Sequence, residues 1–121
     1  MTHDQLVRCV QRYAAAVQAH TRAIEAMDEA GANRHALLIC RLQESIIWEP
    51  AGAEALMALL GHESADVRGM AALHLLPLHP EPALEVLRQM ALLPGLMGFR
   101  ASVALERWAK GELGGSLTHG A

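Results

Sequence analysis

The chain has 121 residues, 52% of them apolar and only 3% aromatic, so it can bury the core of one domain with little left for a second. The apolar excess consists of Ala, Leu and Met, which favour helices over strands, and this composition predicts an all-α protein. The formal net charge of -3 and the sparse arginines, not interleaved with aromatics, argue against a nucleic-acid surface, and no apolar stretch is long enough to span a bilayer.

The N-terminal residues carry charged and polar side chains throughout and lack the apolar core of a signal peptide. We therefore expect a soluble, cytoplasmic protein. Cys9 and Cys40 stand outside any metal-binding spacing. In a reducing compartment we expect both to be buried as small apolar side chains, with a reactive thiol or a disulfide as the alternative.

The first predicted element is a long amphipathic helix that is capped by Thr2 or Asp4 and ends at Gly31. Its apolar positions alternate at spacings of four and three, namely Leu6, Val10, Tyr13, Val17, His20, Ile24 and Met27. So long a seam needs several partner elements or a second copy of the chain. Packing within the chain is the favoured prediction.

A second helix is expected from a cap at Asn33 to a stop before Pro50, because the residue before a proline is pushed out of the helical region. Its apolar residues cover most of the circumference, namely Leu37, Leu38, Ile39, Leu42, Ile46 and Ile47. The pattern predicts a mostly buried helix.

From residue 51 the chain predicts two helical pairs, at 51–62 with 65–78 and at 81–92 with 98–110. Gly61 and Gly111 are expected to end helices, Ser64 to cap one, and Pro82 to lie in a first turn. The pairs resemble each other at an offset of about 31 to 32 residues, with Val67-Arg68 matching Phe99-Arg100, and Leu56 and Leu59 matching Leu87 and Met90. Such a period is typical of a helical solenoid.

The stretch DVRGMAALHLL, which begins at Asp66, resembles the second helix of a HEAT-type repeat, and residues 33–113 are similar to a family of small bacterial HEAT-like proteins classed as a domain of unknown function. The resemblance implies a HEAT-like α-α superhelix of about six helices in one domain at 1–113, followed by a flexible tail at 114–121. In this pattern Asp66 accepts backbone N–H groups at the helix start, and Arg68 reaches carboxylates or carbonyls between stacked units. Gly98 departs from the pattern, because it stands where the repeat has Asp.

Seven histidines invite a catalytic or metal-binding interpretation. The stretch HESAD from His62 differs from HExxH because Asp66 replaces the second His, and it lies between helices. We expect a packed His74 and a His20 that is hydrogen-bonded in the core or sets the helix register. No nucleophile or phosphate-binding motif is present, so we expect no enzyme activity, no metal and no cofactor.

Between Leu42 and Val67 the sequence has five acidic residues and no Lys or Arg. A tryptophan beside carboxylates is typical of a surface that anchors and steers a basic protein. The predicted partner-binding residues are Glu44, Trp48, Glu49, Glu54 and Glu63. The alternative is that Trp48 lies in the core and the carboxylates only form a solvated face. Trp108 is expected in the core.

The resemblance names no activity, but small bacterial HEAT-like proteins include immunity proteins. We therefore expect a protein-binding module that neutralises a cognate toxin with a basic surface, such as a nuclease, by occluding its active site. We expect no nucleic-acid or membrane partner. The alternatives are an adaptor or structural subunit of a cytosolic complex, including a homodimer built on the seam of the first helix, and an enzyme or chaperone acting in a groove. A monomer and a homodimer both remain open.

Overall fold

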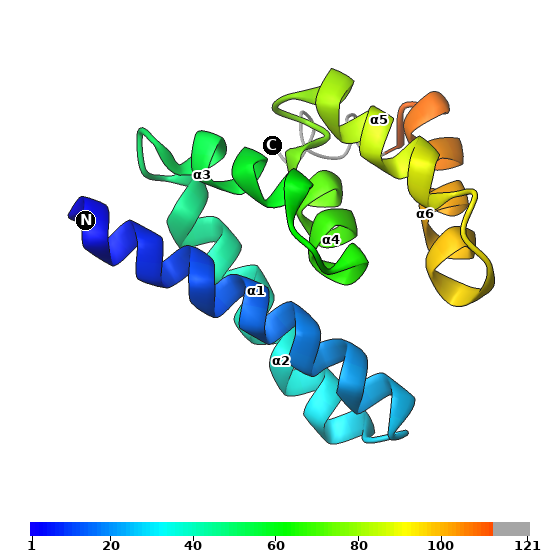
Figure 1. Ribbon diagram of the computed structural model, residues 1–121, viewed down its shortest axis with the longest axis horizontal. Helices are drawn as coiled ribbons and strands as arrows, with labels where there is room; N and C mark the ends of the chain where they lie inside the picture. Colours follow the sequence, from blue (N-terminus) through cyan, green and yellow to red (C-terminus); the bar gives the residue numbers. More distant parts are fainter. Residues whose placement is uncertain (113–121) are drawn as a thin grey trace.

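The computed structural model describes residues 1–112. They form six α-helices and one short 3-10 helix, with no strand in this range: α1 (His3–Glu25), α2 (Glu29–Ile47), α3 (Gly52–Ala58), η1 (Leu59–Gly61), α4 (Ala65–Leu75), α5 (Pro80–Met90) and α6 (Gly95–Ala109) (Figure 1). The predicted all-α class is confirmed, with six helices as expected. The HEAT-like superhelix remains a prediction, and the predicted tail at 114–121 lies outside the described residues.

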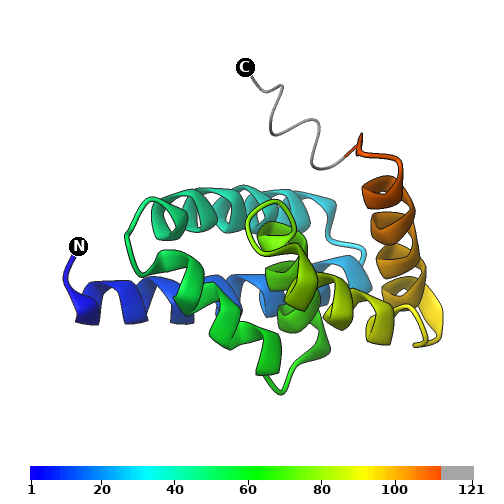
Figure 2. The same ribbon diagram turned by 90° about the horizontal axis from the view of Figure 1, so that it is seen from above.

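The first two helices lie side by side as an antiparallel hairpin (Figure 2). Helix α4 packs against α1, and α5 contacts α4 and α6 on the side away from the hairpin (Figure 1). The start of α1 follows the prediction, because Thr2 forms a capping box with Gln5. The Gln5 N–H donates to Thr2 Oγ1 at 3.1 Å, and the Thr2 N–H donates to Gln5 Oε1 at 2.7 Å. None of the described helices is long and apolar enough to cross a membrane.

The predicted turn after the first helix is wrong. The helix ends at Glu25, and Met27 turns the chain with a left-handed φ of 56°. Asp28 then caps α2, accepting a hydrogen bond from the Gly31 N–H at 2.9 Å. Gly31 therefore lies in the first turn of α2, where a Cβ would overlap the Asp28 carboxylate, and Asn33 is not a cap. An aspartate at the N-cap favours the start of a helix, and here the Asp28 cap outweighs the tendency of Gly31 to end one.

The first part of the α1 seam, from Leu6 to Val17, packs within the chain, as favoured by the prediction, whereas His20 and Ile24 are only half-buried. Leu6, Tyr13 and Val17 belong to the core, where α1 packs against α2, α3 and α4. A homodimer built on this seam would need those contacts to open. Met27 is exposed because the helix ends before it.

The prediction of a mostly buried α2 is wrong. Ile39, Leu42 and Ile46 face the core, whereas Leu37 is exposed. The reason is that α2 packs against α1 and α3 on one side, and no described element covers its other side. Cys40 is exposed on α2, contrary to expectation, and Cys9 is half-buried.

Helix α4 lies at the centre of the fold, in contact with α1, α3, α5 and α6. Its inward residues Val67, Ala71, Ala72 and Leu75 are therefore fully buried. Small alanines at this position allow close approach of neighbouring helices.

Most of the predicted helix boundaries in the second half are confirmed. Pro80 and Pro82 lie in the first turn of α5, Gly61 ends η1, and Gly111 follows α6 with a φ of 76°. Ser64 holds the N-cap position of α4, but its side chain makes no capping hydrogen bond.

The two predicted anchors at the start of α4 behave differently from each other. Asp66 lies in the first turn, where its charge complements the helix dipole. The Arg68 guanidinium donates to the carbonyl oxygens of His62 at 2.7 Å and Glu63 at 3.1 Å. Arg68 thus reaches carbonyls, as predicted, but they belong to the loop before its own helix and not to another unit.

The internal similarity holds in the first helix of each pair and fails in part of the second. Leu56, Leu59, Leu87 and Met90 are all buried, whereas Val67 is fully buried and its counterpart Phe99 is 65% exposed. The physical reason is the number of neighbouring helices. Helix α4 contacts α1, α3, α5 and α6, whereas α6 packs mainly against α5 and only slightly against α4, so Phe99 is left uncovered. A Cβ at the neighbouring Gly98 would overlap the carbonyl of Leu93, so this residue has to be glycine for the α5–α6 turn to close.

Candidate functional site

The five predicted partner-binding residues lie on separate elements. Glu44, Trp48 and Glu49 are at the C-terminal end of α2, Glu54 is on α3, and Glu63 is in the loop between η1 and α4. Trp48 is 85% exposed, so it lies on the surface and the core alternative is wrong. Trp108 is half-buried and packs against the core.

The surface around these carboxylates carries both signs of charge. Arg41 precedes Glu44 by one turn of α2, and the amino group of Met1 lies 3.3 Å from the Glu49 carboxylate. The Arg68 guanidinium is held at the backbone of Glu63. Cationic groups from outside the acidic run therefore lie beside part of it in space.

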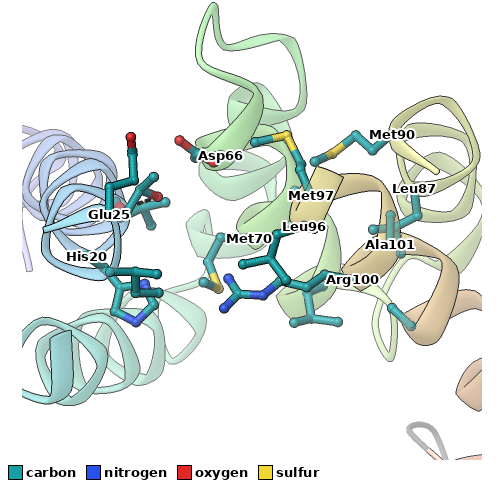
Figure 3. Close-up of a pocket in the computed structure, with 16 residues that line it drawn as sticks. His20, Glu25, Asp66, Met70, Leu87, Met90, Leu96, Met97, Arg100 and Ala101 are labelled. Atoms are coloured by element: carbon teal, nitrogen blue, oxygen red, sulfur yellow. Dashed lines mark hydrogen bonds between the residues drawn. The ribbon is translucent and has the colours of Figure 1, made fainter. Parts of the chain in front are cut away.

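The structure has a groove that the sequence did not predict. It lies between α1 on one side and α4, α5 and α6 on the other, and has a volume of about 260 Å³ (Figure 3). We call it the groove. Its wall on α1 includes Val17, His20 and Ile24.

Three methionines from three helices line the groove, Met70 on α4, Met90 on α5 and Met97 on α6. Methionine is unbranched and polarizable, so a methionine surface adapts to ligands of different shape. Gly69 contributes to the same floor, because a Cβ at this residue would overlap the end of the Met90 side chain. The groove is therefore apolar and deformable.

Charged side chains lie around the groove. Glu25 and Asp66 lie near each other at one end, and His20 and Arg100 lie at the other (Figure 3). Burial, the charge of Arg100 and the charge of His35 together lower the pKa of His20. Within residues 1–112, the ion pairs are Met1–Glu49 and Glu106–Lys110, so Glu25, Asp66 and Arg100 are free to pair with a ligand.

Beside the groove, a buried hydrogen bond joins α1 to α4. Tyr13 Oη lies 2.7 Å from His74 Nδ1, and both side chains are largely buried. Burial lowers the pKa of His74 to about 4 and raises that of Tyr13, so the hydroxyl donates to a neutral imidazole. His74 is thus packed as predicted, whereas His20 lies half-buried on the groove wall and not in the core.

The sequence contains a weak signal for the groove. Met70, Met90 and Met97 occur at positions that helical periodicity assigns to the core, and a core methionine cannot be told from a groove methionine by spacing. Arg100 stands out in the sequence only as the counterpart of Arg68 in the internal repeat. The groove depends on how α4 and α5 hold α6 opposite α1, and α1 and α6 are far apart in the sequence.

The lining of the groove is mostly apolar. Its polar side chains are Thr21 and the ion-pairing groups at the ends, and its floor is aliphatic and thioether. Across residues 1–112, no three His, Cys, Asp or Glu side chains lie together as a metal site. No protein-family model, curated protein or solved structure matches the chain, so the resemblance to HEAT-like proteins stays a prediction.

Proposed function

We propose that the protein is a protein-binding module that holds an apolar segment of another polypeptide in the groove. The observation that supports this most directly is the open floor of three methionines between helices, with unpaired charges at its ends. Apolar pockets with a few polar groups at the edge are the usual form of binding sites.

The energetics suit a polypeptide ligand. Each leucine or methionine that a partner buries in the groove contributes about 1.5 to 3 kcal/mol, and part of this is offset by the cost of association. The charges at the ends then favour one orientation of the bound segment over its reverse. In this proposal the apolar floor of the groove provides most of the affinity, and the charged side chains at its ends provide the specificity.

Removing the apolar surface of the groove should release the partner. Leu73 lines the groove and is partly exposed, so Leu73→Lys places a charge there while the lysine stem reaches solvent. Leu37→Lys is the matched control on the outer side of α2. With tagged protein and quantitative mass spectrometry, we expect Leu73→Lys to lower partner recovery at least about tenfold. Equal recovery from both variants and the wild type would refute the groove as the binding site.

The more specific proposal is that the partner is a toxin, which contacts a second surface formed by Glu44, Trp48 and Glu49. The exposure of Trp48 supports it, because a solvent-exposed tryptophan is a frequent interface anchor. An adaptor or structural subunit is the alternative. A stoichiometric partner with a hydrolase or nuclease domain would favour the toxin, and subunits of a housekeeping assembly would favour the adaptor.

Trp48→Ala should affect binding and not folding. Since Trp48 is 85% exposed, we expect the free energy of unfolding to change by no more than about 0.5 kcal/mol. Affinity for a partner captured by the wild type should fall about 30-fold or more if Trp48 is an anchor. Urea denaturation and isothermal titration calorimetry measure the two effects. A destabilised variant, or unchanged affinity, contradicts the assignment.

A further inference from the structure

An exposed apolar cluster adjoins the groove at the turn between α5 and α6. It consists of Leu92, Leu93, Leu96 and Phe99, and we call it the lip. Leu92 is 86% exposed, and residues 91–99 include no charged side chain. Leu96 also lines the groove, so lip and groove form one continuous surface. Neighbouring apolar side chains of this size on a surface mark an interaction site.

The charges of this surface complement each other in a two-fold arrangement. Glu25 on α1 and Arg100 on α6 lie at opposite ends of the groove (Figure 3). A two-fold axis through the middle of the groove exchanges its ends. The Arg100 of a second copy then faces Glu25 of the first, and the reverse contact forms by symmetry.

The lip of a second copy has the chemistry that would complement the groove. The groove offers an apolar floor with carboxylates at one end, and the lip offers exposed leucines and a phenylalanine directly followed by Arg100. The first part of the α1 seam, from Leu6 to Tyr13, is in contrast already packed within the chain. We propose that the partner in the groove is a second copy of this chain, with each lip in the other copy's groove and Arg100 paired with Glu25 across the interface. This inference rests on the proposed function, since it uses the same groove.

Two single charge reversals and their mixture test this arrangement. Both Glu25 and Arg100 are exposed, so Glu25→Arg and Arg100→Glu should leave the fold intact. Sedimentation velocity over about 1 to 500 μM should show a concentration-dependent dimer for the wild type. Each single variant places like charges together twice, and its dimer should dissociate at least about tenfold more readily.

An equimolar mixture of the two single variants is the decisive measurement. In a mixed dimer the two substituted side chains face each other with opposite charges, and the unchanged Arg100 of one variant faces the unchanged Glu25 of the other. The mixture should therefore recover dimerisation that neither variant shows alone, which also proves that both are folded. Failure of the mixture to recover, when both singles are weakened, would overturn the pairing.

The lip is tested by Leu92→Glu, with Leu37→Glu on the outer side of α2 as the control, since both side chains are exposed. We expect only Leu92→Glu to weaken the dimer, by about tenfold or more. A wild type that stays monomeric throughout, or a dimer that ignores all these changes, overturns the inference. The proposed function is decided separately: if Leu73→Lys releases a polypeptide that the charge reversals and Leu92→Glu leave bound, the groove is a binding site and only the inferred occupant is wrong.

Discussion

Replacing Gly52 with alanine is expected to lower the free energy of unfolding by about 3 kcal/mol, near the upper end of overpacking costs. Gly52 is buried in the first turn of α3, where a Cβ would overlap the carbonyl of Ile46. That carbonyl accepts a hydrogen bond from the Glu49 N–H at 3.1 Å, and the Ile46 side chain is fully buried. The backbone on both sides is therefore held, so the strain has no inexpensive release. Urea denaturation followed by circular dichroism measures the loss.

Gly61→Ala is the matched control for this substitution. Gly61 is likewise at one end of a helical segment, but a Cβ there would have no atom within 4 Å. We expect a change within about 0.5 kcal/mol, because a compatible Gly-to-Ala change mainly restricts the unfolded chain. Equal losses at both positions would contradict the steric explanation and point to a general cost of losing glycine.

Acidification is expected to destabilise the protein through His74, by about 3 kcal/mol. Burial lowers the pKa of His74 from 6.5 to about 4, so between these values the unfolded chain binds a proton that the native imidazole does not. The contribution of this group is fully present above pH 6.5, falls as the pH drops toward 4, and is constant below that. The difference between the two pKa values sets the stated size of the loss.

His74→Gln isolates this effect, because a glutamine can still accept a hydrogen bond from the Tyr13 hydroxyl. Urea denaturation at intervals between about pH 7 and pH 4 should show a shallower loss of stability in this variant than in the wild type. Carboxylates titrate in both proteins, so the difference between the two curves is the relevant quantity. His79→Gln, at an exposed residue, should retain the wild-type slope. A wild-type slope in His74→Gln would show that the imidazole is not protected from protons.

Local sequence signals predicted the helices and several of their ends. Thr2 with Gln5 begins α1, the prolines Pro80 and Pro82 begin α5, and Gly111 follows α6. Each of these signals acts on backbone groups within one turn, so it depends little on the rest of the fold. The turn between α1 and α2 was not predicted correctly because Asp28 can begin a helix and Gly31 can end one. The two interpretations place the turn on different residues, and the structure follows Asp28.

The binding surfaces could not be predicted in the same way. Leu37 and Ile39 are neighbours of the same type, yet only Ile39 is buried, because α1 covers one side of α2 and no described element covers the other. The acidic run is present in the sequence, but only the structure shows that the Met1 amino group lies 3.3 Å from the Glu49 carboxylate and that the Arg68 guanidinium donates to the Glu63 carbonyl. The exposure of a side chain and the charge around it depend on all the residues near it in space, and the sequence does not show which residues those are.

By itself, the sequence determined that this protein is all-α and where most of its helices begin and end, and it matched Leu56 and Leu59 with Leu87 and Met90, all of which are buried. Only the tertiary structure decided that Trp48 is on the surface, that Phe99 leaves the core, and that three methionines and Arg100 line a groove with Glu25. The physical reason is the distance along the sequence over which each effect acts. Capping and helical periodicity act over a few residues, whereas the groove lies between α1 and the helices α4, α5 and α6, which come much later in the chain.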